Sequence, residues 1–244
     1  ACRACLSLSE VPPNFITFTF IQPRQAAYRH VRRELETGRV LVVVSAMGRS
    51  PDPYATDTLL QIGSPLLSAQ ERARLLSIGE QLSSLRVSGE LREAGIDAYA
   101  LPLHQSGIVT DDDYDYAHVR ALRAQGVRAA LDEHEVVVAC GFIAASARGE
   151  VTTLGRGGSD FSAVLFAHML GLEEADIYTD VDAVYSMDPR VDPSACRHER
   201  LSYEEMLKLH SRVLHARCVR YAQAHHIRIH LRGTFSDTAG TLIA

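Results

Sequence analysis

Three glycines around an arginine, followed by a run that can form a helix, are the residues of this chain whose spacing most clearly predicts chemistry. Gly155, Gly157 and Gly158 lie just before Ser159-Asp160, where we expect a helix to begin. The free amides and positive dipole end of a helix N-terminus attract a phosphate or a carboxylate, and Arg156 adds a planar, permanently charged donor. The stretch predicts an anion-binding loop, although glycine-rich turns also serve as plain connections.

A second group of polar residues follows one helix later. The predicted strand 176–179 leads into Thr179 and Asp180, and the next loop carries Asp182, Tyr185 and Arg190. Ligands of open α/β sheets bind beyond the carboxyl ends of the strands, which is where this loop is expected to lie.

The elements that must position these loops alternate between strands and helices. We predict strands at 15–21, 40–45, 98–103, 136–144, 176–179 and 227–231, and helices at 25–37, 69–94 (one helix or two), 116–125, 160–170, 202–207 and 213–225. The β-branched run 40–45 is typical of a strand buried on both faces of a parallel sheet. The alternation predicts an α/β fold in which helices sandwich a mainly parallel central sheet, in three αβα layers. We expect a single domain over 15–244, after a disordered or irregular segment 1–14.

Composition restricts the class of protein. The 244 residues are 46% hydrophobic and 23% charged, as in soluble globular enzymes, and the net charge of −5 leaves no basic footprint for nucleic acid. The sequence shows no apolar stretch of about 18 residues and no signal peptide, so we expect no membrane span and a cytoplasmic location. The five cysteines are scattered, and Cys2-x-x-Cys5 lacks the second pair that a closed zinc site needs. Of the 25 basic residues, only Lys208 is a lysine.

A long series of motifs in this chain resembles the catalytic domain of aspartate kinases, within the amino acid kinase family. The motifs are VLVVVSAMGR (40–49), LLSIGEQLSS (75–84), GIVTDDDY (107–114), TTLGRGGSD (152–160), IYTDVDAVYSMDPR (177–190), LSYEEM (201–206), RVLHAR (212–217) and FSDTAGTLI (235–243). The resemblance implies ATP-dependent phosphorylation of the side-chain carboxylate of L-aspartate to 4-phospho-aspartate, or of a closely related carboxylate. ATP and Mg²⁺ are the implied cofactors, an amino acid is the implied substrate, and a homodimer is the usual assembly.

The resemblance also implies roles for individual residues. Arg156 would bind a carboxylate of the amino acid, and Glu80 would meet its amino group. The implied amino acid pocket consists of Ser45, Glu80, Arg156 and Ser159. The implied nucleotide-binding residues are Gly157, Gly158, Thr179, Asp180, Tyr185, Arg190, Arg212 and Val213. Arg212, Arg156 and Asp160 are the catalytic candidates.

Several of these residues have plainer interpretations. Glu80 also fits a solvated helix face, and Ser45 an ordinary strand end. No protein ligand is assigned to Mg²⁺, because this ion keeps water and phosphate around it. Asp160, Asp180 and Asp182 are the nearest candidates, and Asp160 is as well suited to capping the helix N-terminus. The run 111–113, three aspartates, is interpreted as a solvated loop.

The chain departs from the family at positions that matter for catalysis. Aspartate kinases begin their first strand with a segment close to KFGGTSV, whereas this chain has FTFIQPR (18–24), with Thr19 near the lysine position and Ile21-Gln22 in place of two glycines. A lysine that precedes VLH in the family is replaced by Arg212, and Pro51 lies near a substrate-binding threonine. Arg24 and Arg212 are the candidates to replace the lost charges.

Two alternatives therefore stay open beside the active kinase. One is a catalytically impaired relative that binds an amino acid or nucleotide as a sensor or partner subunit. The other is a kinase for a different carboxylate or a phosphonate-like acceptor. Aspartate kinases commonly carry C-terminal ACT domains, and the sequence given stops where the kinase domain would end, so such a region was either removed or never present.

Overall fold

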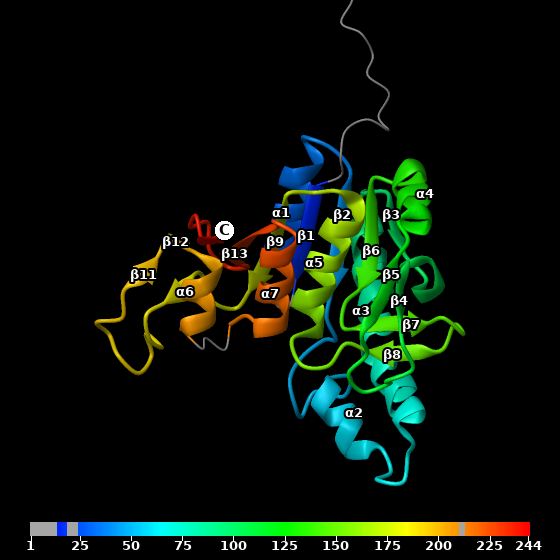
Figure 1. Cartoon of the computed structure of the whole chain (residues 1–244). Helices are drawn as coiled ribbons and strands as arrows, with labels where there is room; N and C mark the ends of the chain where they lie inside the picture. The colour runs from blue at the N-terminus through cyan, green and yellow to red at the C-terminus, as the bar shows by residue number, and fades with distance from the viewer. Residues whose placement is uncertain (1–13, 19–23, 210–212) are drawn as a thin grey trace, which may run out of the picture.

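The computed structural model describes residues 14–18, 24–209 and 213–244, and their helices and strands alternate along the chain (Figure 1). The strands are β1 (Asn14–Phe18), β2 (Val40–Val44), β3 (Ala98–Ala100), β4 (Ile108–Thr110), β5 (Val119–Leu122), β6 (Val136–Cys140), β7 (Ile143–Ser146), β8 (Val151–Thr153), β9 (Glu174–Thr179), β10 (Val184–Tyr185), β11 (Arg197–His198), β12 (Arg200–Leu201), β13 (Arg228–Gly233) and β14 (Thr241–Ile243). The helices are α1 (Arg24–Leu35), α2 (Thr56–Ile62), α3 (Ala69–Glu93), the 3₁₀ turn η2 (Leu103–Gln105), α4 (Gln125–Glu133), α5 (Gly158–Leu170), α6 (Tyr203–Lys208) and α7 (Ala216–Ala224).

The central sheet has eight strands in the order β12-β14-β13-β9-β1-β2-β6-β3. All of its neighbouring pairs are parallel except β13 with β14. The carboxyl ends of β9, β1 and β2 therefore meet at one edge of the sheet, with β1 in the middle. Loops that follow these strands are brought together there, as in other open α/β sheets.

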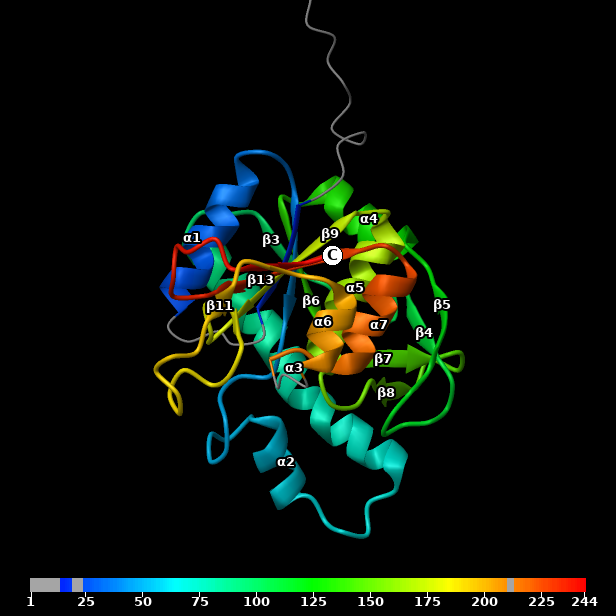
Figure 2. The ribbon, with the colours of Figure 1, turned by 60° about the vertical axis from the view of Figure 1, so that its left-hand side comes forward.

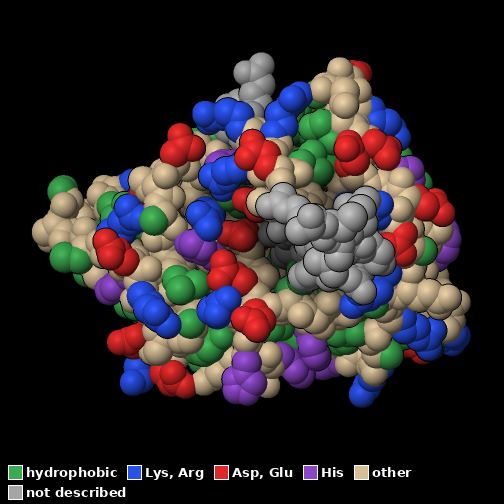
Figure 3. Space-filling view, turned by 90° about the horizontal axis from the view of Figure 1, so that it is seen from above, with side chains coloured by type: hydrophobic (Ala, Val, Ile, Leu, Met, Phe, Trp, Pro, Cys, Tyr) green, Lys and Arg blue, Asp and Glu red, His purple; other side chains and the backbone are tan. Residues whose placement is uncertain are grey.

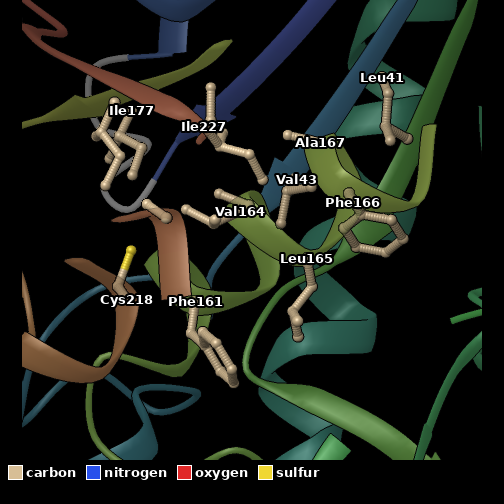
Figure 4. Close-up of a cluster of buried hydrophobic side chains, with 14 of the residues drawn as sticks. Leu41, Val43, Phe161, Val164, Leu165, Phe166, Ala167, Ile177, Cys218 and Ile227 are labelled. Atoms are coloured by element: carbon tan, nitrogen blue, oxygen red, sulfur yellow. The ribbon is translucent and has the colours of Figure 1, made fainter. Parts of the chain in front are cut away.

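Two layers of helices cover the sheet, because β2 is apolar on both of its faces. Val40, Val42 and Val44 belong to a buried cluster with α1 and α3, whereas Leu41 and Val43 pack with α4, α5 and α7. Figure 4 shows the α5 side chains among those of β2, β9 and α7. The predicted three-layer α/β fold with a mainly parallel sheet is confirmed.

A second sheet lies beside the main one and was not predicted. Its order is β5-β4-β7-β8, with β4 parallel to β7 and the other two pairs antiparallel. Figure 2 shows β7 and β8 near α3, with α2 projecting below them. This sheet brings the loop after β8 against the middle of α3.

Two predicted elements are wrong. The helix predicted at 116–125 is instead β5 followed by α4, because Val119–Leu122 pairs with β4. Gly126, which favours a helix end, lies inside α4, where a Cβ would come within 2.5 Å of the Gln105 carbonyl oxygen. The strand predicted at 136–144 is two strands, since Phe142 adopts a left-handed conformation (φ 63°) between β6 and β7.

The remaining predicted elements differ mainly at their ends. α3 is one continuous helix that begins at a capping box formed by Ser68 and Glu71. α7 starts at Ala216 rather than 213, because the His215 side chain accepts a hydrogen bond from the Arg217 amide and caps the helix. The predicted irregular segment 1–14 falls, up to residue 13, outside the described residues, as does the Cys2-x-x-Cys5 pattern.

The described surface has mixed charge. Basic and acidic side chains are interspersed over the face seen from above Figure 1 (Figure 3). Among the described residues, no helix combines the length and the apolar character that a bilayer crossing needs.

Candidate functional site

A cavity of about 510 Å³ lies at the carboxyl edge of the sheet, between the loops after β2 and β8, the start of α5 and the middle of α3. It brings together the residues expected to bind an amino acid, together with the two glycines and the aspartate of the anion loop. They are Ser45, Glu80, Gly157, Gly158, Ser159, Arg156 and Asp160. Asp115 and Thr153, which the sequence did not indicate, also line this cavity.

Glu80 is the buried acid of this cavity, with 2% of its surface exposed, so the solvated-face interpretation is wrong. One carboxyl oxygen accepts a hydrogen bond from the Ala46 amide, whereas Oε2 has no partner among the described residues. Burial raises the pKa of Glu80 from 4.5 to about 8. The helix can approach the loop this closely because residue 79 is glycine; a Cβ there would lie 2.5 Å from the Tyr54 carbonyl oxygen.

The glycine loop ends in the N-terminus of α5. Gly157 is the N-cap in a left-handed conformation (φ 69°), and a Cβ there would lie 2.3 Å from Cβ of His215. α5 begins at Gly158, so the first three amides of the helix have no intrahelical acceptor and the predicted anion site has the required donors.

Asp160 does not cap the helix, contrary to one of its two predicted roles. It is the third residue of α5, behind the Gly157 cap. Its carboxyl group has no hydrogen bond or ion pair with the described residues, and burial raises its pKa from 3.8 to about 7.

Arg156 has an exposed side chain on the rim of the cavity. Its guanidinium makes no ion pair or hydrogen bond with the described residues, so it is available to an anionic ligand. Ser45 follows directly after β2 and Ser159 lies in the first turn of α5, which places hydroxyl groups on two sides of the same cavity.

A second cavity, of about 710 Å³, is formed by the loop after β9 and the residues around α6. Asp180, Tyr185, Arg190 and Val213 line it, together with apolar residues such as Leu209. Thr179 does not line the cavity but donates a hydrogen bond to Asp180 (3.1 Å). Of the predicted nucleotide-binding residues, Gly157 and Gly158 therefore line the first cavity, and Asp180, Tyr185, Arg190 and Val213 line the second.

Within the second cavity, several side chains are already paired. The Tyr185 hydroxyl donates to Asp182 (3.1 Å), and the exposed Arg190 guanidinium binds Asp188 through Nε and Nη2 (3.0 and 2.9 Å). A bound polyphosphate would compete with Asp188 for Arg190.

The residues at the family's lysine and glycine positions, and the predicted replacements for the lysines, lie outside the described residues. They are Thr19, Ile21, Gln22, Arg212 and the side chain of Arg24. The aspartate run 111–113 is a loop held by its own ion pairs: Asp111 binds Arg120 (3.0 Å), and Asp112 binds Arg148 (2.9 Å). These pairs agree with its interpretation as a loop and not as a metal site.

A metal-like cluster elsewhere is already neutralised. Glu174, Asp176 and His230 have ligand atoms within 4.8 Å of one another on β9 and β13. Arg228 binds Glu174 (3.1 Å) and Arg232 binds Asp176 (2.6 Å). The cluster is thus an ion-pair network that joins the two strands.

Sequence reasoning missed Arg217, which holds the anion loop in place. Its guanidinium donates to the carbonyl oxygens of Leu154 (2.7 Å) and Ala117 (2.6 Å) and lies between the rings of Tyr116 and Phe161, at 4.5 and 4.3 Å. It ties the start of α7 to the loop after β8 and to the loop before β5. The RVLHAR motif contains this arginine, but no local pattern indicates which distant carbonyl groups it meets.

We expect Arg217→Ala to lower the free energy of unfolding by about 2 kcal/mol, because two charge-assisted hydrogen bonds and two cation–π contacts are lost. Urea denaturation measures the change. Arg217→Lys should recover less than half of the loss, since an ammonium group cannot reproduce the planar fork. Arg220, an exposed residue on the same helix, gives the matched control Arg220→Ala. An equal decrease in the free energy of unfolding in Arg220→Ala would contradict a stabilising role for the Arg217 contacts.

The fold and the two adjoining cavities define a class: three-layer α/β proteins with an anion loop at a helix N-terminus. A sequence model of the amino acid kinase family matches residues 22–233, and the chain belongs to that family. It is 40% identical over 211 residues to an aspartokinase of Thermus thermophilus, covering 84% of this chain and 51% of that protein. It is 37% identical over 227 residues to aspartokinase 1 of Bacillus subtilis, covering 90% of this chain and 56% of that protein.

A solved structure agrees with these relatives. The crystal structure of aspartate kinase from Synechocystis matches with a TM-score of 0.80 and 33% identity, over 95% of this chain and 40% of that chain. The chain spans about half the length of the curated relatives it matches.

Proposed function

We propose that this chain transfers the γ-phosphoryl group of ATP to the side-chain carboxylate of L-aspartate, forming 4-phospho-aspartate. The observation that carries the proposal is the first cavity, which is lined by a buried acid, by a guanidinium without a partner among the described residues and by the first residues of α5, whose amides are helix N-terminal donors. Glu80 suits the ammonium group of an amino acid, and Arg156 suits a carboxylate. The similarity to aspartokinases over most of this chain supports aspartate as the acceptor.

The second cavity is the proposed ATP site. Its apolar residues and Tyr185 suit a nucleoside, and Asp180, which also lines it, pairs with Arg49 of the loop after β2. The amides of Gly158 and Ser159 at the start of α5 would bind the transferred phosphoryl group, since they are free donors at the positive end of a helix dipole. Phosphoryl transfer depends mainly on such alignment and charge stabilisation.

The donor set also fits Mg²⁺. Asp160 offers an unpaired carboxyl group beside the anion loop, and Asp180 lies at the edge of the nucleotide cavity. When bound, the ion would screen the β- and γ-phosphate oxygens. Asp160 would then be ionised by the neighbouring positive charge, despite the burial that raises its pKa to about 7.

The direct test is a coupled ADP-release assay with aspartate, glutamate or no acceptor. The proposal expects turnover that depends on aspartate and is at least tenfold slower with glutamate, whose side chain is one methylene longer. ATP binding without acceptor-dependent turnover would instead identify a sensor or partner subunit. Faster turnover with another carboxylate would reassign the acceptor.

We also propose that the chain forms a homodimer. Ile78 and Leu85 are 49% and 59% exposed and lie seven residues apart on α3, so both lie on one side of a long helix. Light scattering after gel filtration should give a dimer, and Leu85→Glu should shift it toward the monomer. Leu66→Glu, at a residue 92% exposed outside the helix, is the matched control. A monomeric parent chain would contradict the proposal.

A further inference from the structure

One ion pair joins the loop beside the first cavity to a residue that lines the second. The Arg49 guanidinium binds the Asp180 carboxylate, with 2.7 Å between Nη2 and Oδ2, although the two residues are 131 positions apart. Gly48, immediately before Arg49, lines the first cavity, and Asp180 lines the second. The pair joins the loop after β2 to the loop after β9, across the carboxyl end of the intervening β1.

The backbone of Arg49 is held by Asp52, and its ion pair with Asp180 is exposed. The Arg49 amide donates to the Asp52 carboxylate (3.0 Å), and the Arg49 carbonyl oxygen accepts from the Asp52 amide (2.7 Å). The Arg49 side chain is 71% exposed, and that of Asp180 is 39% exposed. An exposed ion pair contributes little to stability, so the guanidinium can leave Asp180 when a stronger anion arrives.

A triphosphate in the second cavity would supply that anion. Its negative charge repels the Asp180 carboxylate and attracts the guanidinium beside it. Arginine binds phosphate oxygens through two parallel hydrogen bonds, and its charge is permanent. The described arginines that line the two cavities are Arg156, assigned above to the amino acid, and Arg190, paired with Asp188; Arg49 lies beside both cavities, next to Gly48 of the first and paired with Asp180 of the second.

We infer that Arg49 is a catalytic residue that exchanges Asp180 for the γ-phosphate of ATP and neutralises it during transfer. In that step a carboxylate oxygen of the acceptor bonds to the γ-phosphorus. The bond from the γ-phosphorus to the β,γ-bridging oxygen breaks, and ADP leaves with the electron pair. The inference rests on the proposed kinase function, and it adds a contact specific to the γ-phosphate.

Two measurements on Arg49→Ala test the inference. In the ADP-release assay, we expect kcat to fall about 100-fold while the KM for aspartate changes less than threefold, with Arg49→Lys recovering about tenfold. In fluorescence titrations, the parent chain should bind a labelled ATP analogue more tightly than the matching ADP analogue, and Arg49→Ala should remove that preference. Arg148→Ala removes an exposed arginine that pairs with Asp112 and Glu150, away from both cavities, and should change neither measurement by more than twofold.

The outcomes separate this inference from the proposed function. If the parent chain shows no turnover but prefers ATP to ADP, and Arg49→Ala loses that preference, the kinase function is overturned. The contact between Arg49 and the γ-phosphate is then retained. Turnover that stays within threefold in Arg49→Ala, or a preference for ATP that survives the substitution, would overturn the role of Arg49. Absence of nucleotide binding in the parent chain would overturn both.

Discussion

Glu80→Gln is expected to raise the free energy of unfolding by about 2 kcal/mol at pH 7. Burial raises the pKa of Glu80 to about 8, so at neutral pH the folded chain holds a proton that the unfolded chain releases. That difference costs the folded state about 3 kcal/mol at pH 7. Glutamine keeps the acceptor for the Ala46 amide and never ionises, but its amide hydrogens lack an acceptor, which removes part of the gain.

The pH dependence identifies the cause. Below about pH 4.5, Glu80 is protonated in the folded and unfolded states and does not destabilise the fold. Between about pH 4.5 and 8, the free energy of unfolding falls as the pH rises. Above about pH 8, the destabilisation by Glu80 is constant. Urea denaturation should therefore show the advantage of Glu80→Gln growing from pH 5 to pH 8. The exposed Glu93→Gln on the same helix serves as the control and should stay within about 0.5 kcal/mol of the parent at every pH. An advantage of Glu80→Gln that is equal at pH 5 and 8 would exclude the buried acid as its source.

The same substitution should weaken aspartate binding by about 30-fold at pH 8, because the carboxylate proposed to meet the ammonium group is lost. In the parent chain, aspartate must displace the proton from Glu80. Its affinity should therefore rise by nearly tenfold per pH unit between pH 6 and 7.5, with release of a proton. Titration calorimetry in buffers of different ionisation enthalpy measures that proton. Unchanged aspartate affinity in Glu80→Gln would remove Glu80 from the amino acid site.

Arg156→Ala is expected to weaken aspartate binding by about 30-fold and ATP binding by less than threefold. The Arg156 side chain is exposed on the rim of the first cavity and has no partner among the described residues, so the substitution should leave stability unchanged. Calorimetric titration of each ligand separately gives the two affinities.

Arg190→Ala is the reciprocal variant. Arg190 lines the second cavity and pairs only with Asp188 among the described residues, so ATP binding should weaken while aspartate binding is retained. An equal loss of affinity for aspartate and for ATP in Arg156→Ala would show that Arg156 does not belong to the amino acid pocket.

Local patterns were sufficient to predict the anion loop. Glycine at position 157 is required where the chain turns through a left-handed conformation into α5, and a helix N-terminus presents free amides wherever it occurs. The apolar run 40–44 likewise predicts a strand buried on both faces, which β2 is. These features depend on residues near one another in the sequence, so they can be inferred without the fold.

Other features depend on which distant segments meet. Val119–Leu122 is a strand only because β4 offers it hydrogen bonds, and its own residues fit a helix equally well. The residues next to Glu80 in the sequence are those of an exposed helix position. Glu80 becomes a buried acid only because α3 packs against the loop at Tyr54.

The sequence by itself determined the class of fold and the glycine turn that leads into α5, because helix ends, strand burial and turn glycines are local properties. The tertiary structure decided how the site is electrostatically organised: the burial of Glu80, the clamp at Arg217 and the ion pair of Arg49 with Asp180. Charge interactions depend on distance and burial in space: Glu80 becomes buried, and Arg49 and Asp180, 131 positions apart, come within hydrogen-bond distance, only when the fold has formed.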